Sequence, residues 1–281
     1  MMSHRGPDFL YIGPDKSGSS WLFKVLESHP ECYVPPAKDL YYFDKYFENG
    51  LEWYLKFFEK TSPGKKVLGE ISHGYLFDES APQRIYDGFP HMKILTTLRN
   101  PVERSISHYF YLKSGGLINV DIQSAITERP GIINSSLYYE AVKRYLDIFP
   151  RDQLFISYFE DLKDAPRDYA FRIFDFLGLS QLDCMDFSKK VREARKPNSM
   201  FLAKVMKQAS LRARDLGLAN LVGKVKNSEL MNKKLYRPLE KADKENISDG
   251  DKVWLLNQFV EDIDRLQDLM DIDLAHWKVL T

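Results

Sequence analysis

The stretch Phe9-Leu10-Tyr11-Ile12-Gly13-Pro14-Asp15-Lys16-Ser17-Gly18-Ser19-Ser20-Trp21 decides the fold of this 281-residue chain. Its apolar run, Phe9 to Ile12, ends at a glycine, and apolar residues at helical spacing resume at Trp21. This order predicts a strand, a glycine loop and a helix. Because consecutive backbone N–H groups and the helix dipole at such a junction favour an anion, the loop predicts a phosphate site.

The loop keeps the two-glycine spacing of the nucleoside-triphosphate loop but departs from it after the second glycine. Ser19 stands there, whereas the triphosphate loop requires Lys followed by Ser or Thr. The lysine lies inside the loop instead, at Lys16, where its ammonium can lie beside a bridging oxygen of a bound phosphate. A nucleotide kinase or another P-loop phosphotransferase is therefore disfavoured, and no Asp-rich strand end suggests a Mg²⁺ site.

Strand and helix patterns alternate beyond this loop. A helix is expected after Asn100, because a residue before proline prefers an extended backbone and Glu103 completes a capping-box spacing. Such alternation predicts an α/β fold, namely a P-loop-like parallel sheet flanked by helices on both faces, with C-terminal helical decoration. The further strands are expected at Lys66–Gly69, Lys93–Leu98 and Gln153–Tyr158, and helices at Pro101–Leu112, Tyr138–Phe149 and Pro166–Leu177.

A single domain over residues 1–281 fits this organisation best, although the length corresponds to roughly two domains of about 150 residues. The sheet and its helices form a core at about 7–180. Residues at about 187–247 are rich in Lys and Arg and are expected to form a helical, partly mobile annex. Apolar residues at helical spacing predict a closing helix over 248–270.

The composition excludes several classes of function. Lys and Arg number 40 and so do Asp and Glu, so no global basic field exists to gather nucleic acid or an anionic membrane. Cys32 and Cys184 match no metal-ligand spacing and are expected to be reduced, buried thiols. The N-terminal region shows neither a signal peptide nor a membrane span, which favours a cytoplasmic protein unless the chain is a trimmed lumenal domain.

Aromatic residues make up 14% of the chain and are dense between Tyr33 and Phe58. Such density is more typical of a rigid core than of an aromatic-walled pocket. The candidates for a pocket wall are Tyr41, Tyr42, Phe43, Tyr46, Tyr75 and Tyr109.

Two segments resemble the sulfotransferases that use 3′-phosphoadenosine 5′-phosphosulfate (PAPS). Lys16-Ser17-Gly18-Ser19-Ser20 is similar to their 5′-phosphosulfate loop, Lys-Ser/Thr-Gly-Thr/Ser-Thr/Ser. The segment from Leu98 to Tyr109 resembles their 3′-phosphate segment, in which an Arg at a strand end and a Ser in the next helix hold the ribose phosphate. Arg99 and Ser107 occupy those positions. A guanidinium can bind a phosphate through two hydrogen bonds, and both segments follow predicted strands, where α/β folds bind ligands.

The resemblance covers most of the chain and favours the bacterial and heparan-type branch. Lys38 to Asp44 is similar to its Lys-Glu-x-x-Phe-Phe stretch, Gly50 to Tyr54 to its Gly-Leu-x-Trp-Tyr, and Gly69 to Ser72 to its Gly-Glu-Lys-Ser. Ile71 replaces the Lys of this last stretch, which argues against a strongly anionic glycosaminoglycan as acceptor.

The resemblance implies an enzyme that transfers a sulfuryl group from PAPS to a hydroxyl of a carbohydrate, lipid-linked or secondary-metabolite acceptor. It needs no metal and releases 3′-phosphoadenosine 5′-phosphate (PAP). Lys16 is implied as the electrophilic residue, and Ser17, Gly18, Ser19 and Ser20 as phosphate contacts, with helix capping as the alternative role of Ser19. Trp21 either stacks on adenine or packs in the core.

The general base is left open among four residues. Asp39 occupies the position of the Glu that serves in heparan-type relatives, but its side chain is one methylene shorter. His73 and His108 compete with it, because imidazole titrates near neutrality and other branches of the superfamily use His. Glu70 is the remaining candidate.

A basic segment before Pro197 completes the predicted site. Relatives place a mobile basic loop over the nucleotide there, so Arg192, Arg195 and Lys196 are candidates for contact with the 3′-phosphate, although a solvated basic face fits equally well. The alternative to an enzyme is a nucleotide-binding interaction protein that has lost catalysis. The presence of both Lys16 and Asp39 argues against it. The acceptor and the oligomeric state do not follow from the sequence.

Overall fold

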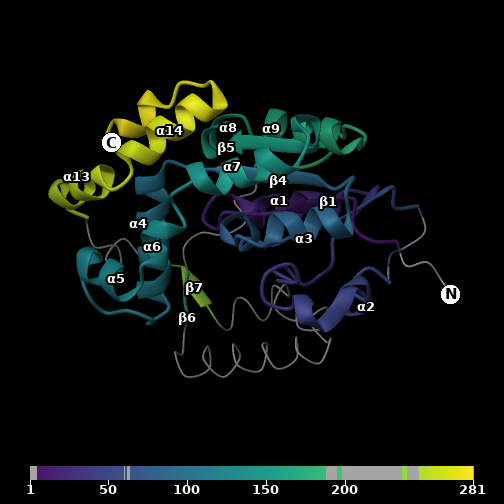
Figure 1. Cartoon of the computed structure of the whole chain (residues 1–281), viewed down its shortest axis with the longest axis horizontal. Coiled ribbons are helices and arrows are strands. Elements are labelled where there is room, and N and C mark those ends of the chain that lie inside the picture. Colours follow the sequence, from purple (N-terminus) through teal and green to yellow (C-terminus); the bar gives the residue numbers. More distant parts are fainter. Residues whose placement is uncertain are drawn as a thin grey trace.

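The computed structural model describes residues 5–59, 61, 64–187, 195–197, 236–238 and 247–280. Its central sheet has five parallel strands in the order β2-β3-β1-β4-β5 (Figure 1). The predicted α/β fold with a parallel sheet is therefore confirmed. The strands are β1 (Phe9–Tyr11), β2 (Cys32–Tyr33), β3 (Val67–Ile71), β4 (Lys93–Leu98) and β5 (Leu154–Tyr158).

Helices connect the strands and close the chain. The bounds of β4 and α9 agree with the sequence prediction, and α7 and β5 differ from it by a residue at one or both ends. The α-helices are α1 (Ser19–Ser28), α2 (Gly50–Leu55), α3 (Ala81–Gly88), α4 (Pro101–Ser114), α5 (Ile122–Glu128), α6 (Gly131–Asn134), α7 (Tyr139–Ile148), α8 (Phe159–Asp164), α9 (Pro166–Leu177), α13 (Asp249–Asn257) and α14 (Val260–Met270). Short 3₁₀ helices are η1 (Phe47–Asn49), η2 (Tyr75–Phe77), η3 (Arg151–Gln153) and η5 (Ala275–Lys278).

Strand β1 separates two hydrophobic cores, because successive side chains of a strand point to opposite faces of the sheet. Phe9 and Tyr11 pack into one core with apolar residues of α1 and α9. Leu10 and Ile12 pack into the other with residues of α3, α4, α7 and α14. Both faces of the sheet are thus covered, which is why all three residues of β1 are apolar and buried.

The dense aromatic segment forms part of the second core. Tyr42, Phe43, Tyr54 and Phe57 are all buried, and the rings of Tyr42 and Tyr54 stack with centroids 4.5 Å apart. Aromatic pairs of this kind add to the stability that burial gives. The interpretation of these residues as core is confirmed, whereas Tyr41 lies half-buried at the edge described below.

Three sequence predictions are wrong in detail. The closing helix is two helices, α13 and α14, because the chain bends at Phe259, which is fully buried between them. Cys184 is exposed, while Cys32 is buried and burial raises the pKa of its thiol to about 12. The annex at 187–247 is not wholly helical, since β6 (Arg195–Pro197) and β7 (Tyr236–Pro238) form an antiparallel pair. Its residues 188–194, 198–235 and 239–246 lie outside the described residues.

The C-terminal helices pack on the face that carries α4 and α7. In Figure 1, α13 and α14 are the yellow helices, and they contact α4 and α7 respectively. A search of the described helices for a stretch long and apolar enough to cross a membrane finds none.

Gly13 at the end of β1 allows the loop to approach β3 closely. Its φ is +120°, and a Cβ there would lie 2.5 Å from the carbonyl oxygen of His73. We expect Gly13→Ala to lower the free energy of unfolding by about 2–4 kcal/mol, from backbone strain and overpacking together. Urea unfolding measures this, with Gly88→Ala as the control, because a Cβ at Gly88 meets nothing within 4 Å. Equal losses in the two variants would contradict the close approach.

Candidate active site

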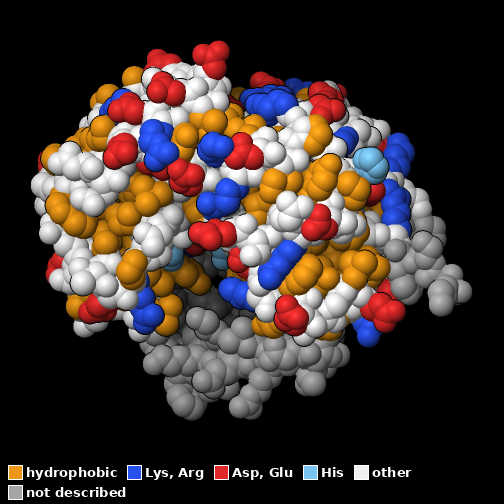
Figure 2. Space-filling model, viewed as in Figure 1, with side chains coloured by type: hydrophobic (Ala, Val, Ile, Leu, Met, Phe, Trp, Pro, Cys, Tyr) orange, Lys and Arg blue, Asp and Glu red, His pale blue; other side chains and the backbone are white. Residues whose placement is uncertain are grey.

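The predicted site residues gather where parallel strands end. The loop 13–18 follows β1, His73 follows β3 and Arg99 follows β4. The carboxyl edge of an open α/β sheet is where such folds bind ligands. Figure 2 shows a hollow in this face of the molecule, with histidine, basic and acidic side chains at its wall.

The loop before α1 ends at the N-terminus of a helix, where backbone N–H groups point outward. Gly18 is the N-cap residue, with a left-handed backbone (φ 90°), and no side chain caps the helix. The alternative role of Ser19 as a cap is therefore wrong. The hydroxyl of Ser17 is buried and has no hydrogen-bond partner among the described residues. Because an unpaired buried hydroxyl is costly, this atom and the helix N-terminus fit a phosphate oxygen.

Lys38 is a basic residue of this loop region to which sequence reasoning assigned no role. Its Nζ lies 3.2 Å from Oγ of Ser19 and 3.4 Å from Oγ of Ser20. The only sequence signal was its place beside Asp39 in the Lys-Asp-x-x-Tyr-Phe stretch. The fold thus brings a second ammonium group to the hydroxyls at the start of α1.

The two motifs that carry the family resemblance touch each other. Nη1 of Arg99 donates to the carbonyl oxygen of Lys16 at 3.0 Å, and its guanidinium also pairs with Glu103 at 2.9 Å. Only the Asn100 half of the expected capping box is seen: its side chain accepts from the backbone N–H groups of Val102 and Glu103. The side chain of Glu103 pairs with Arg99 instead. Ser107 lies half-buried farther along the same helix. The predicted 5′- and 3′-phosphate segments are joined through one arginine.

Lys16 has a left-handed backbone conformation (φ 65°), which is rare outside glycine and is found where a site holds it in place. Its ammonium lies 3.7 Å from the centroid of the Tyr111 ring, on α4. A cation over an aromatic face is stabilised by the ring quadrupole. The lysine therefore lies between the loop and the helix that carries Ser107.

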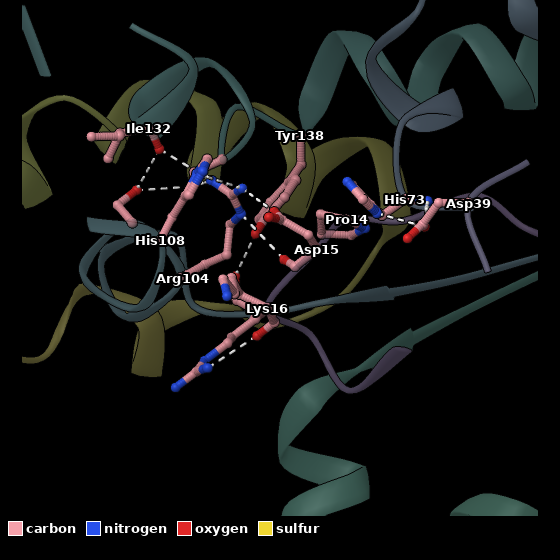
Figure 3. Close-up of polar contacts among 12 residues, drawn as sticks. Pro14, Asp15, Lys16, Asp39, His73, Arg104, His108, Ile132 and Tyr138 are labelled. Atoms are coloured by element: carbon pink, nitrogen blue, oxygen red, sulfur yellow. Dashed lines mark hydrogen bonds and ion pairs between the residues drawn. The ribbon is translucent and has the colours of Figure 1, made fainter. Parts of the chain in front are cut away.

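Two rival candidates for the general base form a single pair. Nδ1 of His73 lies 2.7 Å from Oδ1 of Asp39 (Figure 3). Nε2 of His73 lies 3.2 Å from the hydroxyl of Tyr41. Asp39 and Tyr41 both have positive φ angles, 60° and 56°. Burial lowers the pKa of His73, but the Asp39 carboxylate outweighs it and the pKa is raised overall. Because a carboxylate only accepts, Nδ1 carries the hydrogen and Nε2 faces the tyrosine hydroxyl.

The other two candidates for the base are held differently. Glu70 is fully buried, and the hydroxyls of Tyr54, Tyr75 and Ser72 all donate to it. Burial raises its pKa to about 7, but its oxygens are enclosed by these three donors. His108 points its Nδ1 at Arg104, 3.2 Å away, and burial lowers its pKa to about 4. Neither arrangement is that of a base open to an acceptor.

Trp21 and the basic strand complete the predicted residues. Trp21 is buried, packs against Tyr169 with ring centroids 5.8 Å apart, and donates its indole N–H to the carbonyl of Phe187. This is the core-packing role foreseen as its alternative, and stacking on adenine stays a prediction.

Arg195 and Lys196 lie on β6, beside α4. Their side chains and Arg192 lie outside the described residues.

A search of the described residues for three or more clustered metal-ligating side chains finds none.

The chain matches the family model described as "Sulfotransferase domain" over residues 6–215. Among curated relatives, membrane-associated sulfotransferase kil1 of Dictyostelium discoideum is 23% identical, over 66% of this chain and 58% of its own length. Heparan sulfate glucosamine 3-O-sulfotransferase 6 of Homo sapiens is 29% identical, over 63% of this chain and 54% of its own length. The chain spans about half the length of the curated relatives it matches.

Solved structures show the same fold. A sulfotransferase from Alicyclobacillus acidocaldarius superposes with a TM-score of 0.72 at 24% identity, covering 98% of this chain and 100% of the other. Mouse sulfotransferase SULT7A1, complexed with PAP, superposes with a TM-score of 0.52 at 17% identity, covering 96% and 90%. The family match spans more than half of the residues, so this chain belongs to the sulfotransferase domain family, the PAPS-dependent superfamily that its two phosphate segments resemble.

Proposed function

We propose that this protein transfers a sulfuryl group from PAPS to a hydroxyl of an acceptor. The observation that carries the proposal is the meeting of three features at one edge of the sheet. These are the loop around Lys16, the arginine at the end of β4 that binds the loop, and the Asp39–His73 pair. Bound PAPS supplies an activated sulfuryl group attached to a phosphate leaving group.

The donor half of the site is built from the loop and the two lysines. The unpaired hydroxyl of Ser17 and the amides at the start of α1 bind the 5′-phosphate oxygens. Lys16 and Lys38 place ammonium groups beside them and neutralise the charge that develops on the departing phosphate. Arg99 and Ser107 bind the 3′-phosphate, with Arg99 held in place by Glu103.

The acceptor half of the site uses His73 as the general base and Asp39 as the residue that orients it. Asp39 accepts the Nδ1 hydrogen, which leaves the lone pair of Nε2 available to take a proton. The hydroxyl of Tyr41 donates to Nε2 at 3.2 Å, which is the interaction that an acceptor hydroxyl would make. The carboxylate also stabilises the imidazolium once the proton has moved.

The acceptor that we favour is a hydroxyl of a carbohydrate with little negative charge. Several curated relatives are heparan sulfate glucosamine 3-O-sulfotransferases, which their name describes as acting on an oxygen of a sugar. In this chain Ile71, the last residue of β3, stands where heparan-type relatives have a lysine, and its side chain is buried in the core. The absence of that cation supports an acceptor less anionic than heparan sulfate.

Calorimetric titration with PAP in the absence of metal tests the donor site. We expect Arg99→Ala to weaken PAP binding by about 10–100-fold and binding of 5′-AMP much less, because the lost charge-assisted hydrogen bonds go to the 3′-phosphate. Arg5→Ala is the control, since Arg5 lies at the opposite edge, where it bonds Asp8 and the carbonyl of Lys66. A preference for ATP with Mg²⁺, or binding of neither nucleotide, would overturn the proposal.

A further inference from the structure

A buried arginine connects the phosphate loop to a histidine on α4. Arg104 has no exposed surface, and its Nη2 forms an ion pair with Asp15, the residue before Lys16. Its Nη1 donates to the carbonyl of Ile132 and to Oγ of Ser136, both at 3.1 Å. Nη2 also lies 3.2 Å from Nδ1 of His108 (Figure 3). The guanidinium is thus fixed by partners from three segments.

This contact fixes which ring nitrogen of His108 carries a hydrogen. A guanidinium has only donors, so Nδ1 of His108 accepts, and the hydrogen of the neutral ring lies on Nε2. A second proton on the ring would place two cationic donors against each other. Within the described part of the chain, Nε2 of His108 meets no hydrogen-bond partner. The half-buried ring therefore presents an N–H group that is not bonded to any residue the structure describes.

The charged groups around His108 favour the same state. Burial is the largest influence and lowers its pKa; Arg104, Lys16 and His73 lower it further, while Asp15 opposes them, and the result is about 4. Asp15 stays ionised: burial raises its pKa, but its positive neighbours, Arg104 first among them, together outweigh burial and hold the pKa at about 2. His108 is consequently neutral at every pH at which His73 changes its charge.

The position of the N–H group points to its ligand. His108 follows Ser107 directly and lies one turn before Tyr111, whose ring holds the Lys16 ammonium. Its Nε2–H and the ammonium of Lys16 therefore belong to the same side of the site. Figure 3 shows the Asp39–His73 pair on the other side of Pro14 and Asp15. The two histidines thus lie on opposite sides of the loop that precedes Lys16 in this view.

We propose that His108, held by Arg104, is a hydrogen-bond donor whose Nε2–H binds a sulfuryl oxygen of the bound donor substrate. The inference rests on the proposed function and assigns His108 the reverse of the role of a base. No proton is transferred by His108. A donor whose charge changed with pH would also change in strength, whereas the neutral His108 ring keeps the same hydrogen bond to the group in transfer.

Nitrogen-detected NMR of the ¹⁵N-histidine-labelled chain tests the protonation state without any substrate. We expect one histidine, assigned by its loss in His108→Gln, to show the neutral Nε2–H form from about pH 5.5 to 8. His73, assigned in the same way, should titrate with a raised midpoint. An Nδ1–H form for His108, or titration of His108 within that range, would overturn the inference.

Kinetics and binding test the contact with the sulfuryl group. His108→Leu removes the donor and should lower kcat/KM for PAPS by about 10–100-fold. His108→Gln keeps an N–H group near the position of Nε2 and should restore kcat/KM to within about fivefold of the wild type. Binding of PAP, which lacks the sulfuryl group, should change by less than about threefold in either variant.

The outcomes separate this inference from the proposed function. Equal losses in the leucine and glutamine variants, or a leucine variant with normal kcat/KM, would overturn the role of His108 alone, provided the wild type binds PAP. Failure of the wild type to bind PAP would overturn the proposed function and the sulfuryl contact together. The NMR measurement of the His108 tautomer needs no substrate and is independent of whether the wild type binds PAP or transfers a sulfuryl group.

Discussion

Replacing Lys16 by methionine is expected to lower kcat by about 10²–10³-fold, the effect of removing one preorganised group that stabilises charge in the transition state. Methionine keeps an unbranched apolar side chain that reaches as far as the lysine Cε and removes the charged ammonium. The backbone at this position has a φ of 65°, and both residues bear the same strain there. The variant should therefore retain the fold and the loop, including the bond from Arg99 to the carbonyl of residue 16.

The measurement is single-turnover transfer from PAPS, together with PAP binding by calorimetry. PAP affinity should fall by less than about tenfold, because Ser17, Lys38 and Arg99 remain. Lys24→Met is the matched control, since Lys24 is an exposed residue of α1 paired with Glu27, and its rate should stay within about twofold of the wild type. A Lys16→Met enzyme with a rate close to that of this control would remove Lys16 from the chemistry.

Replacing His73 by alanine is expected to lower kcat by about 10²–10⁴-fold, the usual contribution of a positioned general base. Asp39→Asn should reduce kcat less, because the asparagine oxygen still accepts the Nδ1 hydrogen of His73. A larger loss in Asp39→Asn than in His73→Ala would show instead that the carboxylate takes the proton directly.

The dependence of kcat/KM on pH tests the same role of His73 as the general base. A base must be unprotonated to act, so kcat/KM should rise with pH through the pKa of His73, which lies above the ordinary imidazole value. In Asp39→Asn the carboxylate that raises this pKa is gone, while the burial that lowers it remains. The rising limb should therefore move to lower pH. An unmoved limb would mean that another group controls it.

The regular elements with strong local signals follow from the sequence. The apolar run Lys93–Leu98 and the helix Pro166–Leu177, which begins at a proline and ends at Gly178, have the predicted bounds. The loop after β1 and the arginine after β4 carry their chemistry in consecutive residues, so pattern and resemblance identified both. Family membership is shown by the match over residues 6–215, which include both segments.

Elements that depend on distant partners were missed or misjudged. Strand β2 has only Cys32 and Tyr33, and it exists through its pairing with Val67 and Leu68 of β3. The break between α13 and α14 has neither glycine nor proline to announce it. It occurs because Phe259 is drawn into the core, so that both helices can turn apolar residues such as Leu255 and Ile263 inward.

The sequence by itself determined the strand, the phosphate loop and the set of candidate bases. Only the tertiary structure decided how those candidates are paired. Asp39 and His73 are 34 residues apart and meet because β2 lies beside β3, so that the chain after each reaches the same edge. Asp15 and Arg104 are 89 residues apart and meet because β1 lies beside β4. Hydrogen-bond geometry and pKa depend on these spatial neighbours, and no local pattern encodes the order of strands in the sheet.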